Sequence, residues 1–320
     1  MLDNAPSHPP SNPRTRPKPW PGDWPVCHLR TPQGDTATIS LHGAQVLSWR
    51  TAHHDAHHTL QEHERLYLSP RINWQAVAQG RSAIRGGIPI CWPQFNRRGP
   101  LPKHGLARLL RWKLQEQTPD SANLRLRHTD IPPHLLHNPP QAAGAPSKPL
   151  WLHAFEANLL VKLTAGSLSL RLRVRNTGST PMPFTTAFHG YLATPQIAQT
   201  RISGAEGIRY WDARPNANPS HPVQQGPIRF AGEVDRVYPA FGATLTCGDT
   251  SLRSQQSASL GQTVIWSPHA ALCARLLDLP PYAWQHFVCI EAAQIDSPVL
   301  LAPGAVWQGW QQFQIPSTQG

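Results

Sequence analysis

The chain has 320 residues, of which 29 are Lys or Arg and 18 are Asp or Glu, so its formal net charge is +11 at pH 7. Its 35 prolines argue against a helical bundle, because each proline inside a helix removes a backbone donor and clashes with the preceding turn. We find no run of 18 apolar residues, and residues 1–20 lack the apolar core of a secretory signal. The sequence therefore predicts a strand-rich protein without a membrane partner.

Residues 1–25 contain eight prolines together with Ser, Asn and Arg, a composition typical of a disordered or polyproline-like leader. The pattern changes from residue 26 onward to short apolar runs separated by turn residues. We therefore expect a leader over residues 1–25 and a single domain over residues 26–317.

The clearest strand is expected at residues 167–175, where Leu and Val alternate with Ser and Arg at the period of a half-buried strand. With residues 158–164 and the turn Ala165–Gly166 it predicts a hairpin. Further strands are expected at residues 36–40, 45–49, 65–68 and 124–127, and surface loops at residues 131–149 and 212–227. Many short strands with weak helical periodicity predict an all-β fold, a large antiparallel β-sandwich with few short helices.

Five histidines gather near one predicted turn: His53, His54, His57, His58 and His63. Closely spaced histidines occur in metal sites, but these follow a strand and lie among Thr, Asp, Gln and Glu. We interpret them as an exposed hairpin loop and predict no specific metal site.

The positive charge is concentrated between residues 65 and 115, a segment with no Asp or Glu. It contains ten basic residues: Arg65, Arg71, Arg81, Arg85, Arg97, Arg98, Lys103, Arg108, Arg111 and Lys113. A local positive field attracts anions, and the planar guanidinium suits phosphate or carboxylate. A charge run is often only a solvated face, but here the basic residues are mostly Arg and are interleaved with Gly, Pro, Trp and Phe. The segment therefore suits either a nucleic acid or a small phosphorylated metabolite as partner.

The five cysteines are scattered without a CxxC spacing, which argues against a disulfide framework or a zinc knuckle. They are Cys27, Cys91, Cys247, Cys273 and Cys289. We therefore expect a reducing, cytoplasmic compartment.

Three segments carry residues suited to chemistry: AIRGGIPICWPQF at residues 83–95, LPKHGLAR at 101–108 and CIEAA at 289–293. In the first, two glycines after Arg85 let the backbone turn sharply and approach a ligand closely. No P-loop or GxGxxG motif is present, so no nucleotide cofactor is expected. In the third, Glu291 follows an apolar run. A carboxylate at the end of a buried strand is often only satisfied by backbone donors, but one that lines a cleft is suited to act as a general base.

These segments, in this order, resemble the hexose-6-phosphate mutarotases, also called glucose-6-phosphate 1-epimerases, a branch of the aldose 1-epimerase (galactose mutarotase-like) superfamily. The resemblance covers roughly residues 43–313. Further matching segments are GAQVLSW at 43–49, FTTAFH at 184–189, VDRVY at 234–238, VIWSP at 264–268 and LAPG at 301–304.

The resemblance implies a β-supersandwich with an open cleft that holds an acid–base pair, His189 and Glu291. It implies sugar-phosphate contacts from Arg85 and Arg108 and a carboxylate contact from Asp235. Two neighbouring residues are less determined. Lys103 stands where such proteins commonly have Gln, and His104 either binds a sugar hydroxyl or orients its neighbours.

The implied activity is interconversion of the α and β anomers of an aldohexose 6-phosphate, most simply glucose 6-phosphate, without metal or cofactor. One base removes the proton of the anomeric hydroxyl and one acid protonates the ring oxygen. Three alternatives stay open: a catalytically silent sugar-phosphate-binding or regulatory protein, a neutral-aldose mutarotase, and a nucleic-acid-binding protein. We expect a small hexose phosphate as partner, a monomer, and no nucleic acid.

Overall fold

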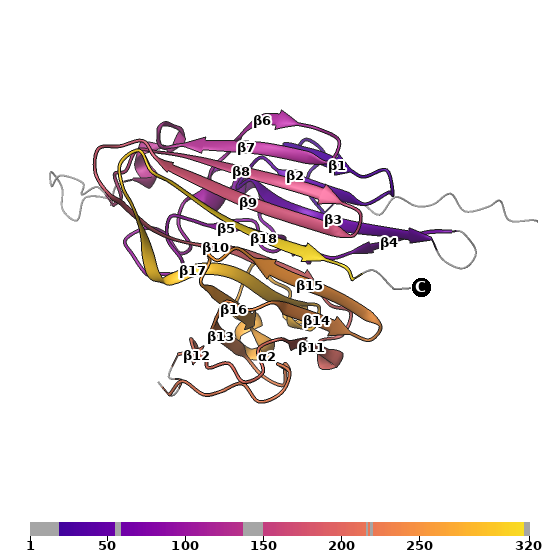
Figure 1. Ribbon diagram of the computed structural model, residues 1–320. Coiled ribbons are helices and arrows are strands. Elements are labelled where there is room, and N and C mark those ends of the chain that lie inside the picture. Colours follow the sequence, from indigo (N-terminus) through magenta and orange to yellow (C-terminus); the bar gives the residue numbers. More distant parts are fainter. Residues whose placement is uncertain (1–18, 55–58, 137–149, 216, 218–219, 317–320) are drawn as a thin grey trace, which may run out of the picture.

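The computed structural model describes residues 19–54, 59–136, 150–215, 217 and 220–316, and it is built from β-sheets (Figure 1). Three sheets of four, six and eight strands are present, and neighbouring strands in each run antiparallel. The predicted all-β class is therefore confirmed, as is the expectation of few, short helices.

The eight-stranded sheet forms one side of the core. Its strands, in order across the sheet, are β11 (Thr200–Ser203), β14 (Ala243–Cys247), β15 (Thr250–Gln256), β18 (Val306–Gln314), β9 (Ser167–Asn176), β8 (Phe155–Thr164), β7 (Ser121–Arg127) and β6 (Lys113–Gln117). The predicted hairpin is confirmed as β8 and β9, which pair from Thr164 and Ser167 outward. Along β9 the apolar residues are buried and the arginines are exposed, as the period of two requires.

The six-stranded sheet carries the candidate site. Its strands, in order, are β12 (Trp211–Asp212), β13 (Val234–Pro239), β16 (Gln262–Ser267), β17 (Phe287–Leu301), β10 (Met182–Ala193) and β5 (Ile90–Cys91). Even-numbered side chains of β10 and β17, such as Phe188 and Ile290, enter the main core. Odd-numbered ones, such as Tyr191 and Cys289, belong to a separate cluster. Successive residues of a strand point to opposite faces, so the odd-numbered side chains share the outer face of this sheet.

The four-stranded sheet consists of β1 (Val26–Arg30), β2 (Thr36–Ser40), β3 (Gln45–His54) and β4 (Leu60–Glu64). The strand predicted at residues 36–40 is confirmed, and the one at 45–49 is longer than predicted. The strand predicted at residues 65–68 is wrong. Those residues follow β4 and make only isolated bridges, Leu66 with Leu192 of β10 and Leu68 with Gly86. The two leucines therefore bridge to different segments, and no single strand pairs with both.

The histidine cluster lies on the β3–β4 hairpin. His53 and His54 belong to β3 rather than to a loop, because the strand continues past Arg50. The ring of His53 stacks on that of His63 from β4, with centroids 5.0 Å apart. His57 and His58 lie outside the described residues.

Helices in the described residues are short: α1 (Trp74–Ala78), α2 (His269–Cys273) and five 3-10 turns, η1 (Ala107–Leu109), η2 (His128–Asp130), η3 (Pro133–Leu135), η4 (Ile197–Gln199) and η5 (Ala283–Gln285). None of the helices described has the length and hydropathy needed to cross a bilayer. The loop predicted at residues 131–149 includes η3, and its part from 137 onward lies outside the described residues. The loop predicted at 212–227 begins at the end of β12.

Most of the predicted leader, residues 1–18, lies outside the described residues. Its described end contacts the domain through Trp20 and Trp24, which pack against a small cluster around Leu47 and Val77. The indole N–H of Trp24 also donates to Ser40 at 2.9 Å.

Candidate active site

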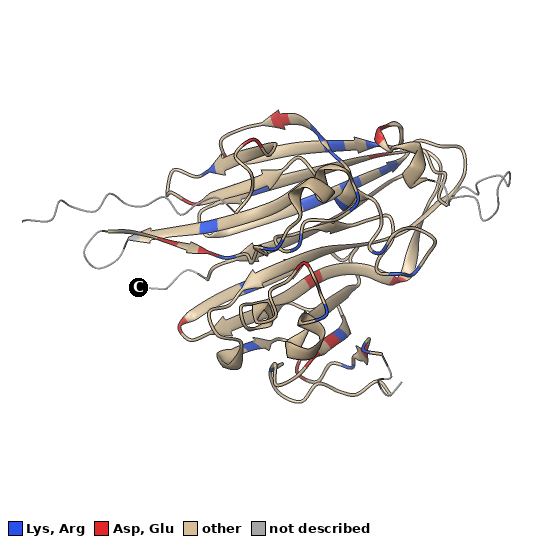
Figure 2. Cartoon of the chain, turned by 180° about the vertical axis from the view of Figure 1, so that it is seen from behind, with Lys and Arg blue, Asp and Glu red and all other residues tan. Residues whose placement is uncertain are grey.

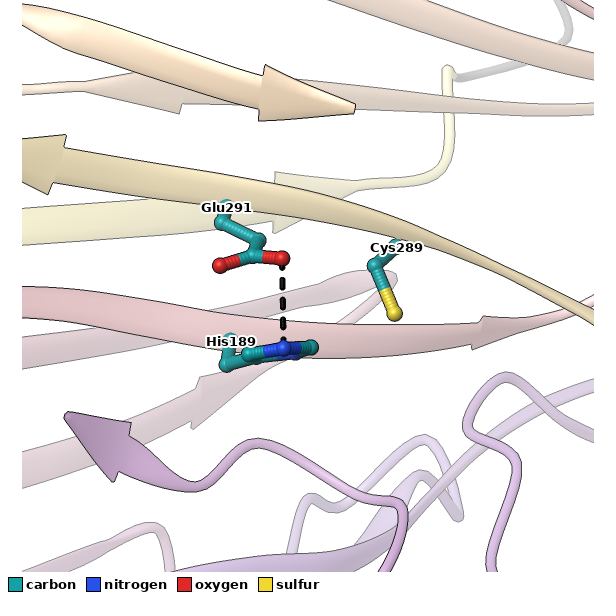
Figure 3. A group of neighbouring side chains, drawn as sticks. All are labelled: His189, Cys289 and Glu291. Carbon is teal, nitrogen blue, oxygen red and sulfur yellow. Dashed lines mark ion pairs between the residues drawn. The ribbon is translucent and has the colours of Figure 1, made fainter. Parts of the chain in front are cut away.

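His189 and Glu291 face each other across two neighbouring strands. They are directly opposite in the β10–β17 register, and His189 Nε2 lies 3.3 Å from Glu291 Oε1 (Figure 3). The two residues are 102 positions apart in the sequence, so the strand pairing alone brings them together. The two predicted catalytic residues therefore form one contacting couple.

The couple is packed among aromatic rings. Tyr191, two residues along β10 on the same face, stacks on the His189 imidazole with ring centroids 4.8 Å apart and an angle of 12°. The indole of Trp266 meets the same imidazole edge-on at 5.9 Å. These contacts fix the imidazole plane, which a proton donor or acceptor needs.

A cleft of about 260 Å³ opens beside His189. It is lined by residues that include Arg81, Arg85, Lys103, His104, Arg108 and His189. Four of the five predicted binding residues thus meet at one cleft. Lys and Arg residues in general are spread over the molecule (Figure 2). Glu291 is 1% exposed and does not line the cleft, but lies behind His189.

Arg85 is placed by the two glycines that follow it. Gly86 has φ +107° and Gly87 has φ +61°, both in the region that favours glycine. A Cβ on Gly86 would lie 2.3 Å from the carbonyl oxygen of Tyr67, and one on Gly87 would lie 2.1 Å from that of Val46. The predicted sharp turn is confirmed, and the close approach that the glycines allow is to the backbone of neighbouring segments. The predicted approach to a ligand stays a prediction.

His104 is fixed by hydrogen bonds that define its tautomer. The Asn96 backbone N–H donates to Nδ1 at 3.3 Å, and the Cys91 sulfur lies 3.2 Å from the same atom. Nδ1 therefore accepts, which leaves the proton on Nε2. Burial lowers the pKa of His104 well below its usual range, and the Arg108 charge adds to this. His104 is thus a neutral donor at the cleft.

Arg108 and Lys103 are joined, since an Arg108 nitrogen donates to the Lys103 carbonyl at 2.6 Å. Neither side chain has a carboxylate within ion-pair distance among the residues the structure describes. Burial lowers the pKa of Lys103, and neighbouring arginines lower it further. Two cations at one wall without counter-charge favour an anionic ligand.

Asp235 is brought to the same sheet face but not to the lining of the cleft. In the six-stranded sheet it pairs with Trp266, which pairs with Cys289, which in turn pairs with Tyr191. Burial and neighbouring carboxylates raise its pKa to about 6. Asp235 lies two strands from Glu291, at the opposite side from Arg85.

The couple itself has opposite pKa shifts. Burial raises the pKa of Glu291 well above its usual range, Asp235 adds to the rise, and Lys103 opposes it. Burial lowers the pKa of His189 well below its usual range, and the arginines of the cleft add to this. Glu291 Oε2 is buried with no hydrogen-bond partner in the described part of the chain, which leaves a costly acceptor for a ligand to satisfy.

Among the described residues, one group of side chains has donor atoms spaced for a metal: His189, Cys289 and Glu291, whose atoms lie within 4.8 Å of one another (Figure 3). Burial raises the pKa of the Cys289 thiol well above its usual range, and a protonated thiol is a poor ligand. The cations of the cleft also repel a metal ion. The donor set fits an acid–base couple better than a metal centre.

Two residues of the site are not among those predicted from the sequence. Asp278 lines the cleft and pairs with Arg85, whose Nε donates to it at 2.9 Å from 193 positions away. Tyr191 accepts a second hydrogen bond from Arg85 at 2.9 Å. For Tyr191 the period of two from His189 along a strand was an available signal; for Asp278 none was.

Comparison with known proteins gives consistent matches. A family model described as aldose 1-epimerase matches residues 25–314. A protein from Cenchrus ciliaris is 31% identical over 295 residues, which cover 88% of this chain and 82% of that protein. One from Salmonella typhimurium is 29% identical over 271 residues, with coverages of 82% and 81%. Both relatives carry the provisional name glucose-6-phosphate 1-epimerase.

A crystal structure from Salmonella typhimurium, provisionally described as a mutarotase, superposes with a TM-score of 0.70 over 92% of this chain and 91% of that chain. The identity between the two is 23%, so this likeness shows the fold alone. It agrees with the predicted mutarotase-like sandwich.

Proposed function

Because this chain belongs to the aldose 1-epimerase family, it is an epimerase, and we propose that it interconverts the α and β anomers of an aldohexose 6-phosphate, with glucose 6-phosphate preferred. One observation carries the proposal. The His189–Glu291 couple adjoins a cleft whose wall presents unpaired cations to a ligand.

Anomerisation requires modest chemistry. A base removes the proton of the anomeric hydroxyl, an acid protonates the ring oxygen, and the ring opens. Rotation about the C1–C2 bond then allows closure on the other face of the aldehyde. One positioned base and one positioned acid suffice, and each contributes about 10²–10⁴-fold.

In our proposal Glu291 is the base and His189 the acid, and the two exchange roles during closure. The unpartnered Oε2 of Glu291 would accept the anomeric hydroxyl once the carboxylate turns from His189 toward the cleft. The stacked Tyr191 ring keeps the imidazole in plane during the transfer.

The remaining predicted binding residues would recognise the sugar phosphate. Arg85, Lys103 and Arg108 supply positive charge for the phosphate, which a neutral sugar would not need. His104 would donate its Nε2 proton to a sugar oxygen. Asp235, on the opposite side of the couple, would accept a hydrogen bond from a sugar hydroxyl.

We also propose a cytoplasmic monomer that binds a small sugar phosphate rather than a nucleic acid. All five cysteines are free and buried, which is usual in a reducing compartment.

The test is to dissolve pure α-glucose 6-phosphate and follow anomerisation by fast polarimetry or NMR, with α-glucose as the parallel substrate. Wild type should exceed the spontaneous rate with the phosphorylated sugar far more than with glucose. His189→Ala and Glu291→Gln should each lower the catalysed rate by about 10²-fold or more.

Each alternative has its own outcome in this assay. Binding of glucose 6-phosphate without acceleration would mean a silent sugar-phosphate-binding protein. Equal acceleration of both sugars would mean a neutral-aldose mutarotase. Full activity in Glu291→Gln would remove the assignment of the base.

A further inference from the structure

Arg85 is held from two sides at the wall of the cleft. Its Nε donates to Oδ2 of Asp278 at 2.9 Å, and its Nη1 donates to the hydroxyl of Tyr191 at 2.9 Å. Among the described residues, Nη2 has no hydrogen-bond partner. Two of the three nitrogens are therefore fixed, and the third is left for a ligand.

The Asp278 carboxylate comes from a well-fixed loop between α2 and η5. The Ser69 hydroxyl donates to the Asp278 carbonyl oxygen at 2.6 Å. The next residue, Leu279, is buried in the cluster that includes Tyr191 and Cys289. The backbone on which the carboxylate sits is thus held by a polar contact and by an apolar one.

The same contacts reach the acid–base couple. Arg85 binds the Tyr191 hydroxyl, and the Tyr191 ring stacks on His189. A chain of contacts therefore runs from Asp278 through Arg85 and Tyr191 to the imidazole.

We propose that Asp278 is a positioning residue for phosphate recognition. Its carboxylate, together with the Tyr191 hydroxyl, fixes the Arg85 guanidinium so that Nη2 is free for the phosphate of the substrate. This inference rests on the proposed function for the identity of the anion.

Asp278 also cancels one positive charge, so its loss has two opposing effects. Without it the long-range attraction for an anion rises, but Arg85 loses the partner that orients its guanidinium. The two side chains are 22% and 34% exposed, so solvent and salt weaken the long-range gain. A misplaced donor loses its short-range hydrogen bond outright. Positioning therefore outweighs the change in charge.

Binding of 1,5-anhydroglucitol 6-phosphate tests the proposal by calorimetry, because this probe has no anomeric hydroxyl and reports binding without turnover. Asp278→Asn should weaken its binding about tenfold, the scale of one hydrogen bond to a charged group. Binding of 1,5-anhydroglucitol, which has no phosphate, should stay unchanged. The matched control is Asp296→Asn, which removes the carboxylate from the Arg98–Asp296 pair, outside the cleft lining, and should change neither probe.

A double-mutant cycle locates the effect. In an Arg85→Ala background, Asp278→Asn should have less than about a twofold further effect, because coupled residues are not additive. Tyr191→Phe keeps the ring and removes the hydroxyl that accepts from Arg85. It should therefore also weaken binding of the phosphate probe without changing binding of 1,5-anhydroglucitol. If Asp278→Asn lowers the thermal midpoint of unfolding, Asp278→Glu serves as the second variant. Because it keeps a carboxylate, it should bind the phosphate probe more tightly than Asp278→Asn does.

Two results would overturn the proposal. One is unchanged or tighter binding of the phosphate probe by Asp278→Asn, which would leave Asp278 only a charge-balancing role. The other is the same loss in the Arg85→Ala background, which would place its action elsewhere. Wild type that binds the phosphate probe but does not accelerate anomerisation would instead refute the proposed function alone.

Discussion

At the acid–base couple, opposite pKa shifts leave one proton for two groups. The pKa of Glu291 is raised by burial and that of His189 is lowered by burial. Between the two apparent pKa values the couple holds a single proton, and the directions of the two shifts favour Glu291 as its holder. Transfer of this proton to His189 across 3.3 Å gives the carboxylate base and the imidazolium acid that our proposal uses. A couple with one proton contains one acid and one base, which is what ring opening needs.

The rate of anomerisation should therefore show a bell-shaped dependence on pH. As pH falls, the couple binds a second proton on His189, and no base is left. As pH rises, the couple loses its only proton and no acid is left. Initial rates with α-glucose 6-phosphate across pH 4–10, corrected for the spontaneous rate, check this.

The substrate phosphate ionises near pH 6 and needs its own control. The same profile measured with α-glucose at high concentration removes that contribution. A rate that falls on only one side of the optimum with both sugars would contradict the shared proton.

The residues of the site differ in how far a sequence can predict them. His189, Glu291 and Arg85 stand in short recognisable segments, and the structure brings two of them to the cleft and the third directly behind. Asp278 stands in no such segment, and only the fold joins it to Arg85. Pairings between distant side chains depend on backbone placement that local patterns do not contain.

Among the elements, the turn after Arg85 is the most constrained. Gly86 has φ +107°, and a Cβ there would meet the backbone of Tyr67 and Leu68 at 2.3 and 2.7 Å. Backbone atoms cannot move aside to make room for a Cβ, as the end of a flexible side chain can. This turn therefore sets both the position of Arg85 and the approach of residues 65–68.

We expect Gly86→Ala to lower the free energy of unfolding by about 3 kcal/mol or more, since strain in the backbone and a steric clash add. Chemical denaturation followed by tryptophan fluorescence measures this. The control is Gly242→Ala, where a Cβ meets nothing within 4 Å and φ is ordinary, so the change should stay within about 1 kcal/mol. Equal midpoints for the two variants would show that the turn is not constrained as described.

Strands can be predicted from the sequence where one face is buried and the other is exposed to solvent. Residues 167–175 alternate in this way, and β9 was predicted to within one residue. Residues 65–68 also alternate, yet they make only isolated bridges, one to Leu192 of β10 and one to Gly86 in a loop. A short alternating pattern indicates which side chains are buried. It does not indicate whether a neighbouring strand pairs with the segment along its whole length.

On the scale of the molecule, folding redistributes the charge of the basic segment. Three of its ten basic residues gain carboxylate partners from outside it: Arg85 with Asp278, Arg98 with Asp296 and Lys113 with Asp130. Basic and acidic residues are spread over both ends of the molecule (Figure 2). The positive field is therefore weaker along the segment than the sequence suggests. At the cleft, Lys103 and Arg108 keep their charge without a carboxylate in ion-pair distance among the described residues.

A local field of this kind predicts a moderate dependence on salt. Raising the salt concentration from about 0.02 to 0.3 M shortens the screening length from roughly 20 Å to below 10 Å. The kcat/KM for glucose 6-phosphate should then fall about threefold or more, because attraction of the dianion to the cleft is screened. The value for glucose, which carries no charge, should not change.

A nucleic-acid-binding surface would behave differently, since many phosphates are neutralised at once and affinity falls by about 10³-fold or more over a similar range. Parallel measurement of glucose 6-phosphate turnover and of binding to a short DNA duplex separates the two cases. A moderate fall in kcat/KM for glucose 6-phosphate, with negligible binding to the duplex, would indicate that the positive charge acts locally at the cleft. Tight, steeply salt-dependent binding to the duplex would instead mean that the basic residues act together as one surface.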